Sequence, residues 1–355
     1  MFEEESLWCH LEALHGAAAA DELRQIYADS FITELDVERV AGLGLTLIRV
    51  PFWYRALEDE DDAGRVTSRT AGWQALDNLV AWARRHGVYL ILDLHGAPGG
   101  QSAYWHQGLR NGGYLFKEQA CADRAAHLWQ QVATYFRGEP HIAAFGLLNE
   151  PDPRRNRADY ERVHQALYEA VRAGDPDRVV VIEDGYQGAD NISSPREMGW
   201  TNAMFSFHAY PGGADAAEYE ANIRNEVAAW EPYWSRFECP ILLGEFSAAD
   251  PGGGVADLEG ARSSFAADAM GRATRALSER GVHWAPWTFK SYTPASHWGL
   301  YNPPEERRFD LRGTDLQTLR AQFASIRSDT FVVHQDYADA LSQSASLPTL
   351  PLTFR

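Results

Sequence analysis

Short apolar runs rich in β-branched residues alternate with amphipathic stretches along most of this chain. Each run is nearly continuous in apolar character, which is typical of parallel strands that are buried on both faces of a sheet. We therefore predict seven strands. They are LTLIRVPF (45–52), VYLILDLH (88–95), IAAFGLLNEP (142–151), RVVVIEDG (178–185), NAMFSFHAY (202–210), PILLGEFSA (240–248) and HWAPWTFKS (283–291).

The segments between these runs repeat apolar residues at helical spacing. Thr33 is a predicted N-cap, and Asp36 stands three positions later, as in a capping box. Gly87 is a predicted helix C-cap. The apolar stripes are Val37, Val40 and Leu43; Leu76, Leu79, Val80 and Ala83; Leu128, Val132 and Tyr135; and Val163, Leu167 and Val171, with further helices over 215–236, 257–281 and 314–328.

Strand and helix alternate over a length that predicts a (β/α)8 barrel, in which one domain commonly exceeds 250 residues. A doubly wound open sheet is the alternative. No G-x-G-x-x-G follows a strand, which argues against dinucleotide binding. We therefore expect a single catalytic domain over residues 1–355, with 1–30 as an N-terminal extension and 329–355 as a polar C-terminal tail.

One strand of the predicted barrel is missing. The first strand should precede the helix near residue 33, but residues 1–30 offer only SLWCHLEAL, which is more typical of a helix or loop. A barrel of seven strands leaves a gap with unpaired backbone groups. We expect residues 1–10 or the tail after 329 to cover this gap, or the native gene to start upstream.

Composition narrows the function. The chain has 355 residues, is 45% hydrophobic and carries a net charge of −18 from 32 basic and 50 acidic residues. No basic cluster interrupts the acidity, so nucleic acid and anionic membranes are poor partners. Aromatic residues make up 12% of the chain, and its 12 Trp suit either a packed core or sugar stacking. A neutral substrate therefore fits the composition better, and a carbohydrate is one candidate.

Cysteines and termini add little chemistry. Cys9, Cys121 and Cys239 form no closely spaced pair, so neither a metal centre nor a disulfide framework is expected, and no cofactor is predicted. No apolar run approaches the length of a membrane span. The acidic start MFEEESLW lacks the features of a signal peptide, which predicts a cytoplasmic location, although a trimmed secreted chain would look the same.

Polar and aromatic residues gather where the predicted strands end. In a barrel, the carboxyl ends of the strands converge on one mouth, where catalysis takes place. A single buried polar residue is usually structural, but a residue of this kind at nearly every strand end favours a site. These residues are Arg49, His95, Asn149, Glu150, His208, Tyr210, Glu245, Trp287 and Lys290.

Two of these carboxylates suit glycosidic bond cleavage. Glu150 and Glu245 follow the fourth and seventh strands when the missing strand is counted as the first, so they face each other across a mouth. One carboxyl can donate a proton while the other attacks the anomeric carbon or activates water. Glu183 and Asp184 are rival acids, ranked lower for lack of amide or aromatic neighbours. A metal site is disfavoured because no H-x-H or H-E-x-x-H is present.

Six motifs, LGLTLIRVPF, LILDLHGAPG, LLNEP, FHAY, LGEF and WTFK, occur in one order over about residues 30–300. In these motifs the chain resembles glycoside hydrolase family 5, whose members are retaining (β/α)8 glycosidases. The stretches FITELDVERVAGLGLTLIRVPFWY and LDLHGAPGGQ resemble its exo-β-1,3-glucanase branch and bacterial relatives. The chain departs from the family in lacking a G-x-N-x-G-x-W-like first strand.

The resemblance implies roles for individual residues. Glu150 matches the acid/base and Glu245 the nucleophile of a retaining mechanism. Asn149 would bind the sugar 2-hydroxyl. Arg49 and Tyr210 would keep Glu245 ionised and oriented, although Arg49 could simply neutralise buried acids.

The remaining residues would bind the sugar. The resemblance places His95 and His208 beside the reacting sugar and Trp287 beneath it. Lys290 accompanies Trp287 at the same strand end, and Trp298 is a candidate outer subsite. Trp53 and Trp105 are equally good candidates for outer subsites or for loop packing.

Two long loops bear on the substrate. GAPGGQSAYWHQGLRNGG follows His95 and SYTPASHWGLY follows Trp287. Long loops above a barrel mouth tend to close a groove into a pocket. We therefore expect exo-action on β-glucans or β-glucosides. The alternatives are an endoglycoceramidase-like enzyme acting on apolar aglycones, a non-catalytic sugar-binding barrel, and a metal-dependent barrel hydrolase.

Overall fold

The computed structural model describes residues 4–60, 65–109, 111–154, 156–248, 261–291, 299–305, 311 and 313–347. The chain divides into two compact units. Unit 1 comprises Met1–Asp21, Leu47–Ser206 and Arg236–Cys239. Unit 2 comprises Glu22–Thr46, Phe207–Ser235 and Pro240–Arg355. Each unit is described by itself.

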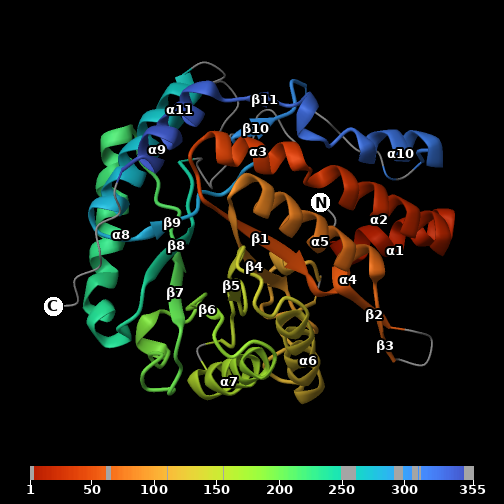
Figure 1. Cartoon of the computed structure of the whole chain (residues 1–355), viewed down its shortest axis with the longest axis horizontal. Helices are drawn as coiled ribbons and strands as arrows, with labels where there is room; N and C mark the ends of the chain where they lie inside the picture. The colour runs from red at the N-terminus through yellow and green to blue at the C-terminus, as the bar shows by residue number, and fades with distance from the viewer. Residues whose placement is uncertain are drawn as a thin grey trace. The chain divides into compact units, whose positions relative to one another are not determined.

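The parallel strands of unit 1 pair side by side in the same order in which they follow one another along the chain (Figure 1). The strands are β1 (Leu47–Trp53), β4 (Tyr89–Gly96), β5 (Ile142–Gly146), β6 (Val179–Glu183) and the start of β7 (Ala203–His208). Leu47 pairs with Tyr89, and Phe145 pairs with both Leu92 and Val180. The central strands are almost entirely buried, as their unbroken apolar character predicts.

Helices cover the strands of unit 1. They are α1 (Glu4–His15), α4 (Tyr54–Leu57), α5 (Thr70–His86), α6 (Gln119–Tyr135) and α7 (Arg157–Gly174), with the start of α2 (Ala17–Phe31). The predicted C-cap is confirmed, because Gly87 adopts a left-handed conformation at the end of α5. Trp129 on α6 is fully buried, packs on Phe145 and donates its indole N–H to the carbonyl of Leu147 at 3.0 Å.

A small hairpin and two short 3-10 helices complete unit 1. The strands β2 (Glu58–Glu60) and β3 (Val66–Ser68) pair antiparallel. The 3-10 helices η1 (Trp105–Gln107) and η2 (Ala189–Asn191) lie in the loops after β4 and β6. The backbone N–H of Glu5 in α1 donates to the carbonyl of Gly108 at 3.0 Å, which ties the N-terminal helix to the loop after β4.

Unit 2 contains the end of β7, β8 (Ile241–Glu245) and β9 (His283–Trp284). Leu242 pairs with His283 in parallel. Its helices are the rest of α2, α3 (Glu34–Gly42), most of α8 (Ala216–Phe237), α9 (Ala261–Glu279), α10 (Leu316–Ala324) and α11 (Gln335–Ala345). The capping box that the sequence predicts at Thr33 and Asp36 is confirmed at the start of α3.

The segment after residue 329 is more ordered than the predicted polar tail. The strand β11 (Val332–Val333) pairs antiparallel with β10 (Tyr301–Asn302), directly after the 3-10 helix η4 (Ser328–Thr330). Helix α11 packs on α9, where Thr274 donates to Ser344 at 2.7 Å in a buried contact. Residues 332–345 thus belong to the packed part of unit 2, because an apolar face with Tyr337 and Leu341 is buried.

The strand order is β1-β4-β5-β6-β7-β8-β9. All seven predicted strands are present, although the third ends at Gly146 and the last is only two residues long. A doubly wound sheet reverses its strand order at a switch point, and this order does not. The described residues before β1 form α1, α2 and α3 rather than a strand, as the helical character of residues 1–30 indicates.

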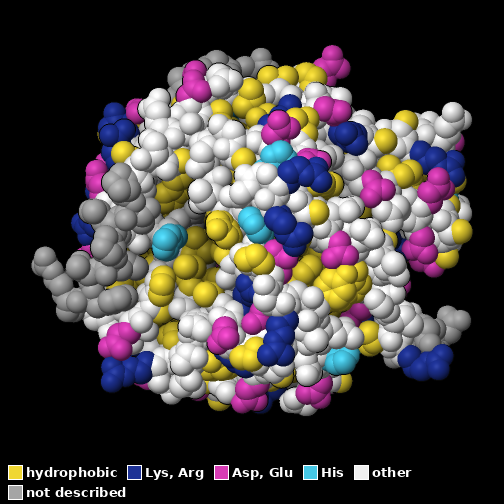
Figure 2. Space-filling view, viewed as in Figure 1, with side chains coloured by type: hydrophobic (Ala, Val, Ile, Leu, Met, Phe, Trp, Pro, Cys, Tyr) yellow, Lys and Arg dark blue, Asp and Glu magenta, His cyan; other side chains and the backbone are white. Residues whose placement is uncertain are grey.

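Two surface properties bear on the predicted partners. On the face shown in Figure 2, Lys and Arg side chains are interspersed with acidic and uncharged ones. Among the helices that the structure describes, none combines the length and apolar character needed to cross a membrane.

Candidate active site

The strand ends of unit 1 bring together three of the predicted site residues. Arg49 in β1 donates from Nη2 to Asn149 Oδ1 at 2.6 Å. The same nitrogen lies 3.0 Å from Asp93 Oδ2 and 3.9 Å from Glu183 Oε2. The guanidinium is therefore the cationic centre of a buried cluster that contains two carboxylates and an amide.

His95 completes this cluster in unit 1. Asn149 Nδ2 lies 3.3 Å from His95 Nε2, and His95 Nδ1 lies 3.1 Å from Asp93 Oδ2. An amide NH₂ can only donate, so Nε2 accepts and Nδ1 carries the proton that is shared with Asp93. The Arg49 contact fixes the amide in the matching orientation, with its oxygen toward the guanidinium. Asn149, with 1% of its surface exposed, is thus oriented from both sides.

Asp93 and Gln101 belong to this site although the sequence analysis missed them. Gln101 is fully buried and donates to the carbonyls of His95 at 2.7 Å and Asn149 at 2.9 Å, joining the ends of two strands. A Cβ at Gly146 would come within 2.6 Å of Asp93 Oδ1, which explains the glycine in FGLLNEP. The sequence does carry a signal for Asp93, because it is a charged residue inside the apolar run VYLILDLH, two positions before His95.

Glu150 follows the end of β5 in a left-handed backbone conformation, with φ of 42°. Its side chain is 18% exposed. Oε2 accepts a hydrogen bond from the Tyr186 hydroxyl at 2.9 Å and lies 3.5 Å from His106 Nε2. The negative charge of Glu150 and, above all, burial raise the pKa of the Tyr186 phenol well above 10. Tyr186 therefore remains a hydrogen-bond donor at every pH of interest.

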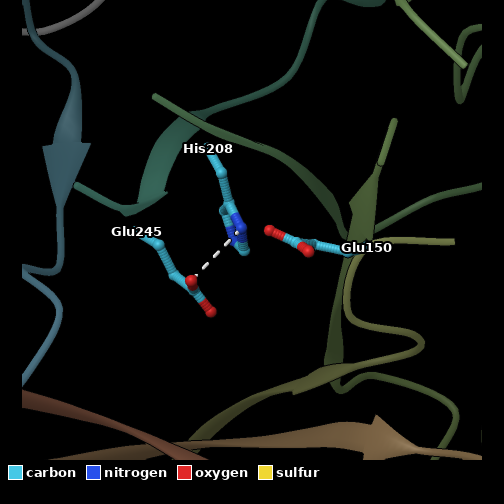
Figure 3. Close-up of side chains that lie close together, drawn as sticks. All are labelled: Glu150, His208 and Glu245. Carbon is cyan, nitrogen blue, oxygen red and sulfur yellow. Dashed lines mark ion pairs between the residues drawn. The ribbon is translucent and has the colours of Figure 1, made fainter. Parts of the chain in front are cut away.

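Unit 2 assembles a second cluster around Glu245, the last residue of β8. Tyr210 donates from its hydroxyl to Glu245 Oε2 at 2.7 Å. His208 Nδ1 lies 3.5 Å from the same oxygen (Figure 3). The backbone N–H of Ala209, between these two residues, donates to the carbonyl of Glu245 at 3.0 Å. The short turn after β7 thus aligns both side chains with the carboxylate.

Trp287 and Lys290 follow β9 in unit 2. Trp287 is half-buried, and its backbone N–H donates to the carbonyl of Phe246 at 2.9 Å, directly after Glu245 in the chain. Lys290 is buried and donates to the carbonyl of Ile326 at 3.1 Å and to Ser328 Oγ at 3.2 Å. Burial, above all, lowers the pKa of Lys290 to about 8. These contacts favour a structural role for Lys290 over the predicted sugar contact.

Trp53, Trp105 and Trp298 are the remaining tryptophan candidates for outer subsites. Trp53 is buried, and the space against its ring exists because Gly96 has no side chain: a Cβ there would come within 2.4 Å of Trp53 Cδ1. Loop packing therefore accounts for Trp53. The side chain of Trp105 and the whole of Trp298 lie outside the described residues.

The predicted residues thus form two local clusters. Arg49, His95 and Asn149 are joined within unit 1, and His208, Tyr210 and Glu245 within unit 2. The predicted pairing of Arg49 with Glu245 involves both units and stays a prediction. As for metals, His208 and Glu245 are two neighbouring potential ligands in unit 2.

Comparison with known proteins adds the family. The family model described as Cellulase (glycosyl hydrolase family 5) matches residues 16–293, which is more than half of the chain. The chain therefore belongs to glycosyl hydrolase family 5. The predicted resemblance is confirmed by this match.

Individual relatives are similar over part of their length. A β-xylosidase of Phanerodontia chrysosporium is 35% identical over 52% of this chain and 38% of its own length. A probable glucan 1,3-β-glucosidase A of Emericella nidulans is 27% identical over 62% of this chain and 55% of its own. The chain therefore spans about half the length, or less, of these relatives.

Solved structures support the fold. Endoglucanase Cel5A from the hyperthermophilic Thermotoga maritima is 17% identical, with a TM-score of 0.61 over 87% of this chain and 90% of that chain. At this identity the likeness concerns the fold alone, and it agrees with the strand order that excludes a doubly wound sheet. The predicted (β/α)8 barrel class is thus confirmed, and the described residues that precede β1 in the sequence are helical.

Proposed function

We propose that this chain is a retaining β-glycosidase that hydrolyses β-glucosidic bonds in glucans or glucosides. The observation that carries the proposal is the contrast between two carboxylates, one beyond the carboxyl end of a parallel strand and one at such an end. Glu150 is partly exposed and follows β5, whereas Glu245 is buried at the end of β8 with a tyrosine hydroxyl on its oxygen. Membership in glycosyl hydrolase family 5 supports the assignment of chemistry to this pair.

The proposed reaction has two displacements. In the first, a carboxylate oxygen of Glu245 forms a bond to the anomeric carbon while the bond to the leaving oxygen breaks and Glu150 gives that oxygen its proton. In the second, Glu150 takes a proton from water, the water oxygen attacks the anomeric carbon, and the bond to Glu245 breaks. Two inversions give net retention, and both carboxyl groups return to their starting protonation states.

Neighbouring residues have supporting roles in this proposal. Asn149, which is held by Arg49 and His95, is oriented to bind a sugar hydroxyl. Tyr210 and His208 contact one oxygen of the Glu245 carboxylate and so orient the group for attack. Trp287 is the proposed platform for the sugar ring. Aromatic faces suit the apolar face of a sugar.

The stereochemical course tests the proposal. Purified protein is incubated with an aryl β-glucoside, and the anomeric protons of the product are followed by NMR from the first minutes. We expect the β-anomer to form first and mutarotation to follow. Release of the α-anomer first would contradict the retaining mechanism and would fit carboxyls roughly 6.5–9.5 Å apart rather than about 5–5.5 Å. Turnover that EDTA abolishes would favour a metal-dependent hydrolase instead.

We further propose exo-action, on the length and aromatic content of the two loops after His95 and Trp287. Relatives bear both exo-type and endo-type names, so the family leaves this point open. Steady release of glucose from laminari-oligosaccharides is the expected result. A rapid loss of viscosity of lichenan with little free glucose would instead show cleavage within the chain of the polymer.

A further inference from the structure

The segment after β6 lies against the corner that carries Glu150, and both belong to unit 1. The backbone N–H of Glu150 donates to Glu183 Oε1 at 3.0 Å. The backbone N–H of Tyr186 donates to the carbonyl of Pro151 at 3.2 Å, and its hydroxyl donates to Glu150 Oε2 at 2.9 Å. Residues 183–186 therefore hold both the main chain and the side chain of this corner.

Glu183 is itself held firmly. It is 4% exposed, and its Oε2 lies 3.9 Å from the Arg49 guanidinium. Its carbonyl accepts a hydrogen bond from the hydroxyl of Tyr160 on α7 at 2.7 Å. A buried carboxylate needs charged or hydrogen-bonding partners to offset its lost hydration. One of those partners is the N–H of Glu150.

Gly185 allows the close approach of the two segments. Its φ of 55° lies in the left-handed region, and a Cβ at this position would come within 2.3 Å of the Pro151 carbonyl oxygen. A side chain here would clash with backbone atoms, which cannot move aside without displacing the corner. The glycine therefore brings Glu183 and Tyr186, on its two sides, into contact with Glu150.

Glu150 needs this support because its own backbone is also left-handed, with φ of 42°. Such a conformation is uncommon for a residue with a side chain and persists where the surroundings determine it. The Glu183 contact fixes the peptide nitrogen of Glu150, and the Tyr186 contact fixes the far end of its side chain. Two anchors at opposite ends of one residue leave the carboxyl little rotational freedom.

We propose that Glu183 and Tyr186 are positioning residues for Glu150, Glu183 through the backbone N–H and Tyr186 through Oε2 of the carboxyl group. This inference rests on the proposed role of Glu150 as acid/base. The Tyr186 hydroxyl donates to Oε2 and thereby restrains the orientation of the carboxyl group. A hydroxyl that donates to a carboxylate also favours the ionised form over the protonated form.

Other groups of unit 1 also face this carboxyl. His106 Nε2 lies 3.5 Å from Glu150 Oε2 and 3.3 Å from Ser102 Oγ. The ring of Tyr104 packs on Tyr186 with 4.9 Å between centroids, and its backbone N–H donates to Ser102 Oγ. Tyr104 thus packs its ring on Tyr186, but the hydroxyl that donates to Glu150 belongs to Tyr186. It provides a matched control for removal of the Tyr186 hydroxyl.

The first experiment compares Tyr186→Phe with Tyr104→Phe and the wild-type chain. With phenyl β-glucoside, whose leaving group needs a proton, we expect kcat to fall roughly tenfold for Tyr186→Phe. With dinitrophenyl β-glucoside, kcat/KM, which reports a first step that needs little protonation, should stay within about twofold. The alkaline limb of kcat/KM should move up by roughly half to one pH unit. Tyr104→Phe should match the wild type in all three measurements.

The second experiment separates positioning from folding at Glu183. Glu183→Gln keeps an oxygen that can accept the Glu150 N–H, whereas Glu183→Ala removes it. We expect the Gln variant to recover most of the kcat that the Ala variant loses, at matched melting temperatures. Equal losses in the two variants, or an unchanged pH profile and leaving-group dependence in Tyr186→Phe, would overturn the inference.

A titration that does not use catalysis distinguishes failure of this inference from failure of the proposed function. Carboxyl-carbon NMR of Glu150 should show a higher titration midpoint in Tyr186→Phe than in the wild type. A wild-type chain that cleaves no β-glycoside would reject the proposed function, yet the contact between Tyr186 and Glu150 would still be tested. An unchanged midpoint in an active enzyme would reject the inference alone.

Discussion

The surroundings of Glu150 in unit 1 and of Glu245 in unit 2 differ in almost every respect. Glu150 follows its strand by four residues, has a left-handed backbone and leaves 18% of its side chain exposed. Glu245 is the last residue of its strand, and its side chain is 7% exposed. Each carboxylate nevertheless has one oxygen bound by a tyrosine hydroxyl and approached by a histidine.

This difference corresponds to the two roles in the proposed mechanism. A group that exchanges protons with a leaving group and then with water needs access to both, which an exposed corner beyond the strand provides. A nucleophile must instead remain ionised and aimed at one carbon, which a regular strand end and a short turn provide. The similar tyrosine and histidine pairs show that orientation matters for both groups, whereas exposure separates them.

Removal of either carboxyl group should have the largest effect on activity and should separate the roles of Glu150 and Glu245. We expect Glu245→Ala to lower kcat by roughly 10⁵-fold on every substrate, because no covalent intermediate can form. Azide should restore turnover with an α-glycosyl azide product. Glu150→Ala should spare the first step with dinitrophenyl β-glucoside but not with phenyl β-glucoside. Near-wild-type activity of Glu245→Ala would refute its assignment as nucleophile.

Acid should lower the stability of the folded chain through His164 on α7. This residue is fully buried, its ring stacks on Tyr160 at 3.8 Å between centroids, and Nδ1 lies 2.9 Å from the Tyr160 carbonyl. Tyr160 in turn binds the carbonyl of Glu183. Burial lowers the pKa of His164 to about 4, because it disfavours the imidazolium. Between pH 6.5 and 4 the unfolded chain thus binds a proton that the folded chain does not.

The free energy of unfolding should therefore decrease as the pH falls through this window, by about 3 kcal/mol from this group. His164→Phe keeps a stacking ring without a titrating nitrogen, so its urea-denaturation free energy should depend less steeply on pH. Equal slopes for wild type and His164→Phe would show that His164 binds protons equally in the folded and the unfolded chain, which would contradict the prediction.

The smallest effect should come from a hydroxyl on the nucleophile side. Tyr210→Phe removes the hydrogen bond to Glu245, and such bonds to charged groups contribute about 1.5–3 kcal/mol. We expect kcat to fall roughly 10-fold to 100-fold on phenyl and dinitrophenyl β-glucosides alike, because nucleophilic attack is common to both. A loss of kcat on phenyl β-glucoside alone would make Tyr210 resemble Tyr186. It would then contradict the proposed difference between the surroundings of Glu245 and Glu150.

The sequence by itself determined the fold class and the main chemical groups. Seven apolar runs gave seven parallel strands, since continuous burial requires continuous apolar character, and the caps at Thr33 and Gly87 follow local rules of backbone geometry. The clusters around Asn149 and around Glu245 also follow from strand order, because parallel strands bring their carboxyl ends to one edge.

Only the tertiary structure decided which polar groups contact each other. Glu183 lacks an amide or aromatic neighbour that would mark it as a site residue in the sequence, yet it accepts the N–H of Glu150, 33 positions away. Lys290 resembles a pocket residue beside Trp287, but it donates to Ile326 and Ser328, 36 and 38 positions away. Periodicity reports the face on which a side chain lies, whereas the partner of a hydrogen bond depends on which distant segment packs on that face.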